Sequence, residues 1–138
     1  MDKALNFLAL ARKAGLAELG EEPVGGAARA GKAYVIAVAS DASDHTWRRA
    51  KSFVAGTDQQ AIRVTFTKDE LGFVVGRTSL AIAAITDAAM AASMVKALPD
   101  VAKHAAALAA LEEKVARLKQ RKAEAKAHQR NVRMGKKK

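Results

Sequence analysis

The residues most suggestive of chemistry are two glycines and a lysine within residues 19–43. Gly26, Gly31 and Lys32 match the first seven positions of the phosphate-binding pattern G-x-x-x-x-G-K-[ST]. A nucleotide loop of this kind needs a hydroxyl at the eighth position to bind Mg²⁺, and it must follow a strand and open a helix. Here the eighth residue is Ala33, and the apolar, β-branched run that follows it predicts a strand. The glycines therefore end a helix, and we do not expect nucleotide binding at this stretch.

The other polar side chains form no catalytic or metal-binding pattern. His45, His104 and His128 are far apart in the sequence, and none lies at a metal-ligand spacing. Ser, Asp and His occur together in "SDASDH" (residues 40–45), but side chains this close in sequence cannot converge as a catalytic triad does. The chain has no cysteine, which excludes disulfides and thiol nucleophiles and fits a reducing cytoplasm. We therefore predict a protein that is not an enzyme and has neither a cofactor nor a metal ion.

The positive charge of the chain is concentrated at its C-terminal end. Residues 1–98 contain 12 Lys and Arg against 10 Asp and Glu, whereas residues 99–138 contain 12 against 4. The net charge of +10 is thus made of +2 from the first segment and +8 from the second. This asymmetry indicates a polyanionic partner, usually nucleic acid, with an acidic membrane surface as the lesser alternative. No apolar run reaches the length of about 18 residues that a membrane span needs, and the N-terminus does not have the pattern of a signal peptide.

Helix and strand signals alternate along residues 1–98, which we predict to form one α/β domain with helices on both faces of a sheet. Capping residues mark helix starts at Asp2, at Thr67 with Glu70, and at Asp87. Trp47, the only tryptophan, is expected in the core and not stacked on a base. The predicted helices cover residues 3–14, 22–31, 44–55, 68–75 and 88–96, and the predicted extended segments cover residues 16–19, 34–39, 61–66 and 80–86.

Residues 99–138 are predicted to form a second unit, a long C-terminal helix with a basic tail. Apolar residues recur at spacings of three and four from Val101 to Leu118, which favours a helix lying on the domain over a coiled-coil homodimer. Beyond Leu118 charge dominates, and this end is expected to be frayed or disordered when alone. Its basic residues are expected to follow RNA phosphates without reading bases. The candidates named for this role are Arg117, Lys119, Arg121, Lys122, Lys126, Arg130 and Arg133.

Five segments in order resemble one known family. They are "LALARKAG" (residues 8–15), the spacing from Gly20 to Gly31, "VIAVASDAS" (35–43), "TKDELGFVVG" (67–76) and "AITD" (84–87). Over about residues 3–96 the chain resembles the kink-turn-binding ribosomal protein family, the L-seven-Ae family, and within it the small bacterial YlxQ-type proteins. The resemblance implies a three-layer α/β/α sandwich with a mixed sheet of about four strands, which would bind a sharply bent RNA at the start of its second helix.

The residues at the start of that helix depart from the family pattern. Gly20 keeps the family's glycine, whereas Glu22, Pro23 and Gly26 stand where the family has Asn, Glu and Lys. Together with Glu21, these residues lower the positive charge at the expected RNA site and remove a phosphate contact. The replacements therefore predict weakened binding of standard kink-turns.

The resemblance places further residues at the RNA surface and implies a function. Arg29 lies in the RNA-facing helix, and Lys32 is expected near the RNA edge; Arg77, Thr78 and Ser79 form the loop before the last strand. Asp41 and Ser43 border the same surface, but we expect them to act as helix caps. The chain is thus expected to be a cytoplasmic protein that binds structured RNA, associated with the ribosome or another ribonucleoprotein. The alternative is a protein-interaction module that keeps the fold and has lost kink-turn binding.

Overall fold

A mixed four-stranded sheet forms the centre of the protein. The computed structural model describes residues 2–135, with side chains up to Arg130. The strand order is β1-β4-β2-β3, in which β2 and β3 are parallel and β4 is antiparallel to both β1 and β2. The strands are β1 (Ala17–Leu19), β2 (Val35–Val38), β3 (Gln60–Arg63) and β4 (Ile82–Ile85).

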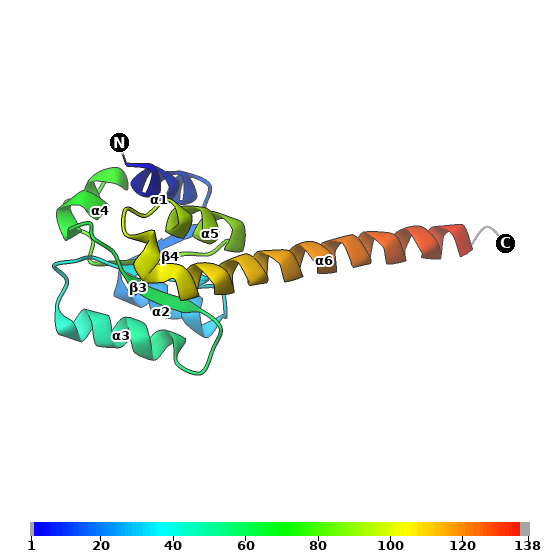
Figure 1. The fold of residues 1–138 in the computed structure, drawn as a ribbon, viewed down its shortest axis with the longest axis horizontal. Helices are drawn as coiled ribbons and strands as arrows, with labels where there is room; N and C mark the ends of the chain where they lie inside the picture. The colour runs from blue at the N-terminus through cyan, green and yellow to red at the C-terminus, as the bar shows by residue number, and fades with distance from the viewer. Residues whose placement is uncertain (1, 136–138) are drawn as a thin grey trace.

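Helices cover both faces of this sheet (Figure 1). One face carries α2 (Glu21–Arg29) and α3 (Asp44–Val54), which pack against each other. The other face carries α1 (Lys3–Lys13), α4 (Lys68–Val74) and α5 (Ala88–Lys96), with α1 in contact with both α4 and α5. The arrangement confirms the predicted three-layer α/β/α sandwich.

Side-chain caps explain where four of these helices begin. The carboxylate of Asp2 accepts the N–H groups of Ala4 and Leu5 at the start of α1, and the carboxylate of Asp87 accepts the Met90 N–H at the start of α5. The Ser43 hydroxyl caps α3, and Thr67 forms with Glu70 the reciprocal capping box of α4. The capping roles expected of these residues are confirmed.

Small aliphatic side chains fill the core. The central strands β2 and β4 are buried along their whole length. The largest fully buried side chains are only leucines and isoleucines, namely Leu8, Ile36, Leu71, Ile82 and Ile85. Trp47 is half-buried and packs against the edge of this core. The core is thus made mainly of alanine, valine, leucine and isoleucine.

The loops that follow β1 and β2 and precede β4 meet at one end of the sheet, which we call the loop edge. The Gly20 N–H donates to the Ile82 carbonyl at 3.0 Å, and the Ala39 N–H donates to the Ala81 carbonyl at 2.9 Å. The strand register brings these loops together, because β1 and β2 both lie antiparallel to β4. The loop edge comprises residues 20–22, 39–43 and 76–81.

The opposite end of the sheet, the far edge, contains the start of β2 and the end of β4. Val35, the first residue of β2, lies beside Ile85, the last residue of β4. Because α2 starts at the loop edge and leads back to the start of β2, residues 29–34 belong to the far edge. The segment that opens α5, residues 86–88, follows β4 there as well.

The C-terminal segment begins with a 3-10 turn, η1 (Val101–His104), and continues as one helix, α6 (Ala105–Gly135). Its 31 residues correspond to a length of about 46 Å. The first half packs along α5 and buries Ala107 and Leu111, while Leu108 and Val115 lie against the core. The apolar face of the helix is therefore used within the chain, as the preferred interpretation of the sequence expects.

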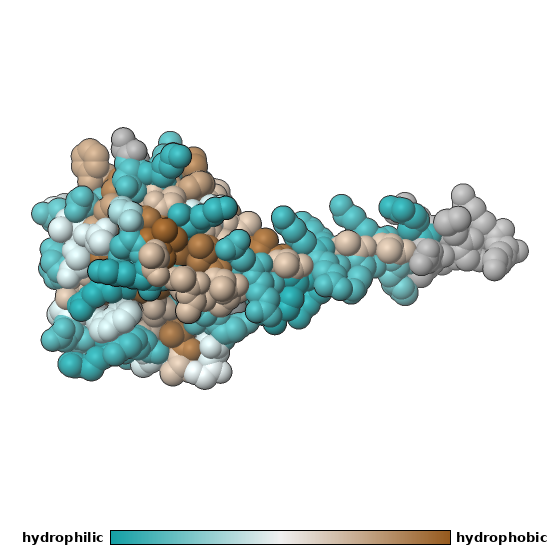
Figure 2. All heavy atoms as spheres, viewed as in Figure 1, coloured by the Kyte–Doolittle hydropathy of each residue, from teal (hydrophilic) through white to brown (hydrophobic). Residues whose placement is uncertain are grey.

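Residues 119–135 project from the domain, and we call them the arm (Figure 1). All side chains from Lys119 to Arg130 are exposed, and the coloured part of the arm is mainly hydrophilic in Figure 2. The expectation of a frayed or disordered end is wrong for the arm, because α6 continues to Gly135. Its alanine, lysine, arginine, glutamine and glutamate residues are all strong helix formers, which explains the continuation.

Candidate nucleic-acid interface

Gly20 shapes the turn from β1 into α2. Its φ of 98° lies in a region that favours glycine, so another residue at this position would be strained. Gly20 also occupies the N-cap position of α2 and supplies no capping side chain. The first turn of α2 therefore has backbone N–H groups at Glu21 and Glu22 that no side chain of its N-cap accepts, while Pro23 has no N–H to offer. Such a helix start, with its positive dipole end, can accept an anion.

The loop before β4 is held tightly against α4. The Arg77 N–H donates to the Gly72 carbonyl at 2.8 Å, and the Leu80 N–H donates to the Lys68 carbonyl at 3.0 Å. Gly72 makes this approach possible, since a Cβ there would lie 2.8 Å from the Arg77 carbonyl oxygen and 2.9 Å from the Ser79 nitrogen. Gly72 is thus a residue that sequence reasoning did not single out, although it positions the whole loop.

The structure brings Gly20 and Arg77 together. The Nη1 atom of Arg77 lies 3.9 Å from the position that a Cβ on Gly20 would occupy. Thr78 and Ser79 follow in the same loop with exposed side chains. A guanidinium group, two hydroxyls and the start of α2 therefore share one surface, which can donate several hydrogen bonds to phosphate and sugar oxygens.

An ion pair alters the charge at this surface. The Arg49 Nε atom, on α3, lies 2.7 Å from the Glu21 Oε1 atom at the start of α2. The close contact of the two helices makes this pair possible: Gly25 on α2 faces Phe53 on α3, where an added Cβ would lie 3.0 Å from the ring. The negative charge of Glu21 is thereby compensated. Arg49 was missed at the sequence level, because only the packing of α3 on α2 brings it to the loop edge.

Two polar residues of the loop edge have structural partners. The Asp41 carboxylate accepts the backbone N–H of Lys68 at 2.8 Å, so it caps the start of α4 from a different loop. The Ser43 hydroxyl accepts the Thr46 N–H at 3.1 Å and caps its own helix. Capping is confirmed for both residues. Asp41 caps α4, a helix that is remote from it in sequence.

Three of the sequence-based candidates lie away from the loop edge. Gly26 is in the middle of α2, Arg29 ends that helix, and Lys32 precedes β2. The expectation that Lys32 lies near the same edge as Gly20 is wrong, because α2 carries the chain across the sheet to the far edge. Lys32 and Arg29 are exposed there.

The stretch that matches the phosphate-loop pattern uses its N–H groups within the protein. The Gly31 N–H donates to the Ala28 carbonyl at 3.0 Å, and the Lys32 N–H donates to the Ala27 carbonyl at 2.9 Å. The Ala33 N–H donates to the side chain of Gln59, which is buried. These bonds close the end of α2. The backbone here has no row of N–H donors for a phosphate.

Comparison with known proteins supports the architecture. No protein-family model matches the chain, and no curated protein matches it. The fold is similar to that of a Bacillus halodurans protein of unknown function, with a TM-score of 0.65 and 24% identity over 70% of this chain and 96% of that one. It is also similar to the Giardia lamblia 15.5kD RNA binding protein, with a TM-score of 0.61 and 17% identity over 76% of this chain and 87% of that one. These similarities establish the fold.

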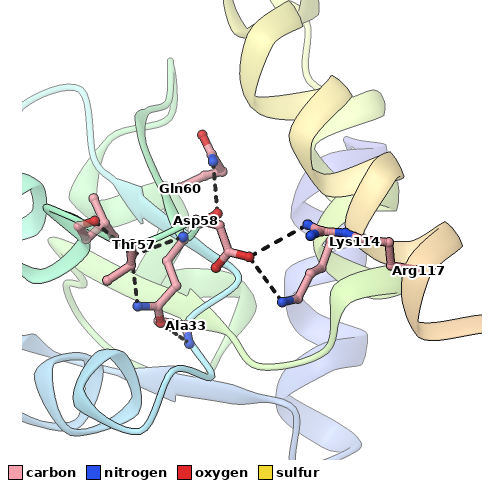
Figure 3. Close-up of polar contacts among 8 residues, drawn as sticks. Ala33, Thr57, Asp58, Gln60, Lys114 and Arg117 are labelled. Carbon is pink, nitrogen blue, oxygen red and sulfur yellow. Dashed lines mark hydrogen bonds and ion pairs between the residues drawn. The ribbon is translucent and has the colours of Figure 1, made fainter. Parts of the chain in front are cut away.

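At the base of the arm, Asp58 holds two basic residues of α6. The Lys114 Nζ atom donates to Asp58 Oδ2 at 3.1 Å, and Arg117 Nη2 lies 3.8 Å from the same oxygen (Figure 3). The hydrogen bond from Lys114 lowers the pKa of the Asp58 carboxyl, and the charge of Arg117 acts in the same direction. This cluster ties α6 to the segment before β3. Arg117, one of the RNA candidates, therefore has an acidic partner within the protein, Asp58.

The remaining tail candidates lie on the arm. Arg133 belongs to α6 but lies outside the residues whose side chains the structure describes. The other five are exposed, and the first part of the arm still borders the domain; they are Lys119, Arg121, Lys122, Lys126 and Arg130. Within the same stretch the only acid is Glu124, which accepts a hydrogen bond from Gln120 at 3.2 Å. The arm thus presents an excess of positive charge.

The part of the chain that the structure describes contains neither a metal-binding cluster nor a helix that could span a membrane. Across residues 2–130, no three His, Cys, Asp or Glu side chains come together in a way that could hold a metal ion. His104 instead pairs with Asp100 at 3.2 Å, close to the start of α6. Among the helices that the structure describes, none is long and apolar enough to cross a membrane.

A second exposed surface lies between α1 and α4. Phe73 is 80% exposed and lines a shallow depression with Leu5, Phe66 and Val74. The acidic residues Asp2, Asp69 and Glu70 also line it. An exposed aromatic residue over an apolar depression is typical of a protein-binding surface.

Proposed function

We propose that this chain is a non-enzymatic RNA-binding protein that binds structured RNA with its loop edge and gains further affinity from its arm. The observation that carries the proposal is the meeting of Arg77, Thr78 and Ser79 with the start of α2 at Gly20. The Giardia protein that shares this fold is an RNA-binding protein, which supports the same role here. Fold alone is a weak argument for function, so the proposal depends on the chemistry of the site.

The loop edge is suited to reading the shape of a folded RNA. Regular RNA helices hide their base edges, so proteins recognise bends, bulges and loops through the backbone. The Arg77 guanidinium would pair with a phosphate, the Thr78 and Ser79 hydroxyls would contact phosphate or ribose oxygens, and the N–H groups that open α2 would face the anionic backbone. Compensation of Glu21 by Arg49 removes part of the repulsion that the acidic residues would otherwise exert.

A kink-turn is the structured RNA that the family resemblance favours, and the YlxQ-type branch is the subgroup. Ribosomal RNA or another translation-linked ribonucleoprotein in the cytoplasm would then be the setting. Glu22 replaces the amide of the family's motif with a carboxylate, Pro23 has no polar side-chain group, and Gly26 has no cationic one. We therefore expect binding weaker than that of a protein with the full motif. Arg77 and the backbone of α2 would supply most of the affinity at this edge.

The alternative function is that of a protein-interaction module with the same fold. The exposed Phe73 and its depression favour this alternative. The apolar face of α6 does not, because Leu111 and its neighbours pack on α5 of the same chain. A partner that binds at Phe73 would bury an apolar side chain, and such binding would persist at high salt.

The test is titration of a fluorescent kink-turn RNA with the full chain at several salt concentrations. A version with its sheared G·A pairs replaced serves as the control RNA. Arg77→Ala should weaken binding of the kink-turn by about tenfold, as loss of a charge-assisted hydrogen bond worth about 1.5 kcal/mol implies. Arg12→Ala, which removes an equal charge from the exposed C-terminal turn of α1, should leave the affinity nearly unchanged.

Two outcomes would argue against the proposal. Equal binding of both RNAs, with no effect of Arg77→Ala, would show that the loop edge does not read the kink. Absence of RNA binding at low salt, together with partner binding that Phe73→Ser abolishes, would establish the interaction module instead.

A further inference from the structure

The loop edge and the arm lie at opposite ends of the molecule. β4 runs from the loop edge to the far edge, where α5 begins, and α6 passes back along α5 in the opposite direction. Leu108 therefore lies near Lys96 at one end of a shared groove, and Lys119 lies near Ala89 at the other. At the far edge, Lys119 and Lys122 line a depression with Tyr34 and Thr86. The arm thus leaves the domain from the far edge, remote from the loop edge, and projects away from it (Figure 1).

Four of the five basic side chains that the structure describes on the arm lie on one side. A residue advances by about 100° around a helix, so positions three, seven and eleven residues apart share a face. Lys119, Lys122, Lys126 and Arg130 have this spacing and fall within a sector of about 80°. We call these four residues the basic stripe. Arg121, Gln120, Glu124 and His128 lie on the opposite side.

The arm holds its direction relative to the domain. No glycine or proline interrupts α6 between Ala105 and Met134, so the helix has no built-in hinge there. Burial of Ala107 and Leu111, together with the pairing of Lys114 with Asp58, anchors the half that lies on the domain. The 17 residues of the arm extend about 25 Å beyond this anchor.

From this geometry we infer that the protein bridges two RNA segments. The inference rests on the proposed function: the loop edge would grip a bent RNA, and the basic stripe would lie along the phosphate backbone of a second segment, either in another molecule or in a distant part of the same one. Because the loop edge and the stripe lie at opposite ends of the molecule, we expect one short RNA to occupy only one of the two surfaces. The stripe has no aromatic side chain and would bind any duplex, without sequence preference.

The bridge can be measured by energy transfer between two RNAs. A donor-labelled kink-turn and an acceptor-labelled plain duplex are mixed with the full-length protein at low salt. We expect a transfer signal that rises to a maximum near equimolar protein and falls at excess protein, because separate copies then occupy each RNA. Binding of each RNA alone is measured in parallel by anisotropy, and light scattering checks for aggregation.

A pair of charge-matched variants tests the role of the stripe. Lys122→Gln with Lys126→Gln should abolish most of the transfer signal and reduce the slope of log K against log salt for the duplex by about 2. The control, Lys51→Gln with Lys103→Gln, removes the same charge from exposed positions outside both the arm and the loop edge and should keep the signal.

The possible failures are distinguishable. If each RNA binds alone but the two compete, a single site serves both and the bridge is disproved, while RNA binding stands. If only the duplex binds, the loop edge does not hold a kink-turn, and both the bridge and that part of the proposed function fail. If both variant pairs lose the signal equally, the net charge of the protein and not the basic stripe holds the duplex, and the stripe is disproved.

Discussion

Arg49 and Glu21 form an ion pair across the contact of α3 with α2, with 2.7 Å between Nε and Oε1. Both side chains are about half exposed, so we expect the pair to contribute less than about 1 kcal/mol to folding. Its position matters more than its strength. It lies at the first residue of α2, directly after Gly20, where it compensates an acid on the proposed RNA surface.

Arg49→Met is therefore expected to weaken RNA binding with little effect on stability. The substitution leaves the Glu21 carboxylate to repel phosphate, at a cost of about 1 kcal/mol or about fivefold in affinity at low salt. Anisotropy titration of the kink-turn RNA measures this change. The double variant Glu21→Gln with Arg49→Met should recover most of the loss, and no recovery would mean that Arg49 contacts the RNA itself.

Gly72→Ala should damage the loop edge. A Cβ at this position meets the backbone of Arg77 and Ser79 at 2.8 and 2.9 Å, so the loop must move. We expect a loss of about 1–3 kcal/mol in the free energy of unfolding, measured in urea, and weaker RNA binding. Gly26→Ala is the control in α2: its Cβ would meet only the end of the Arg29 side chain, at 3.9 Å. That substitution should stabilise the protein by about 0.5–1 kcal/mol, and equal destabilisation by both would contradict the packing described for Gly72.

Leu111→Ala tests the attachment of α6. Leu111 is only 2% exposed, so its truncation should lower the free energy of unfolding by about 2–5 kcal/mol. Leu118, further along the same face, is half-buried, and Leu118→Ala should cost less than about 1.5 kcal/mol. Denaturant unfolding compares the two variants. Similar small losses for both would show that α6 does not pack on the domain at Leu111.

The pH dependence of stability should reveal the contacts of Asp58. Its pKa in the folded protein lies below the ordinary value of 3.8, chiefly because Lys114 donates a hydrogen bond to it. The unfolded chain therefore binds this proton more tightly, and the stabilisation is present above the unfolded pKa and lost as the pH falls through the folded one. Compared with Asp58→Asn, the native protein should be more stable by less than about 1 kcal/mol from pH 7 to pH 5. The difference should vanish well below pH 3.8, and a difference that grew on acidification would contradict this pairing.

Much of the fold can be predicted from local sequence signals. Caps at Asp2, Ser43, Thr67 and Asp87 mark helix starts because each carries its own hydrogen-bond acceptor. Apolar runs rich in β-branched residues mark the buried strands, because this pattern can also be recognised within a short stretch of sequence. The helical arm was missed because charge and low hydropathy indicate disorder, although the same residues have high helix propensity.

The candidate site was predicted less completely, because its geometry depends on contacts between distant segments. Gly20 and Arg77 are adjacent only through the pairing of β1 with β4. The partnership of Arg49 with Glu21 needs the close packing of α3 on α2, and the displacement of Lys32 to the far edge follows from the path of α2. None of these relationships has a signal in the spacing of residues.

The unbroken course of α6 from its buried half into the arm makes the arm sensitive to helical phase. The buried Leu111 fixes the rotation of α6 about its axis on the domain. Because the helix is continuous, this rotation also sets the direction of every later residue. One residue inserted after Leu118 would turn the basic stripe by about 100° and advance it by about 1.5 Å, while the composition of the arm would hardly change. Seven inserted residues, close to two full turns, would nearly restore its direction. RNA binding by the arm should thus depend on the direction in which the basic stripe faces, as well as on its charge.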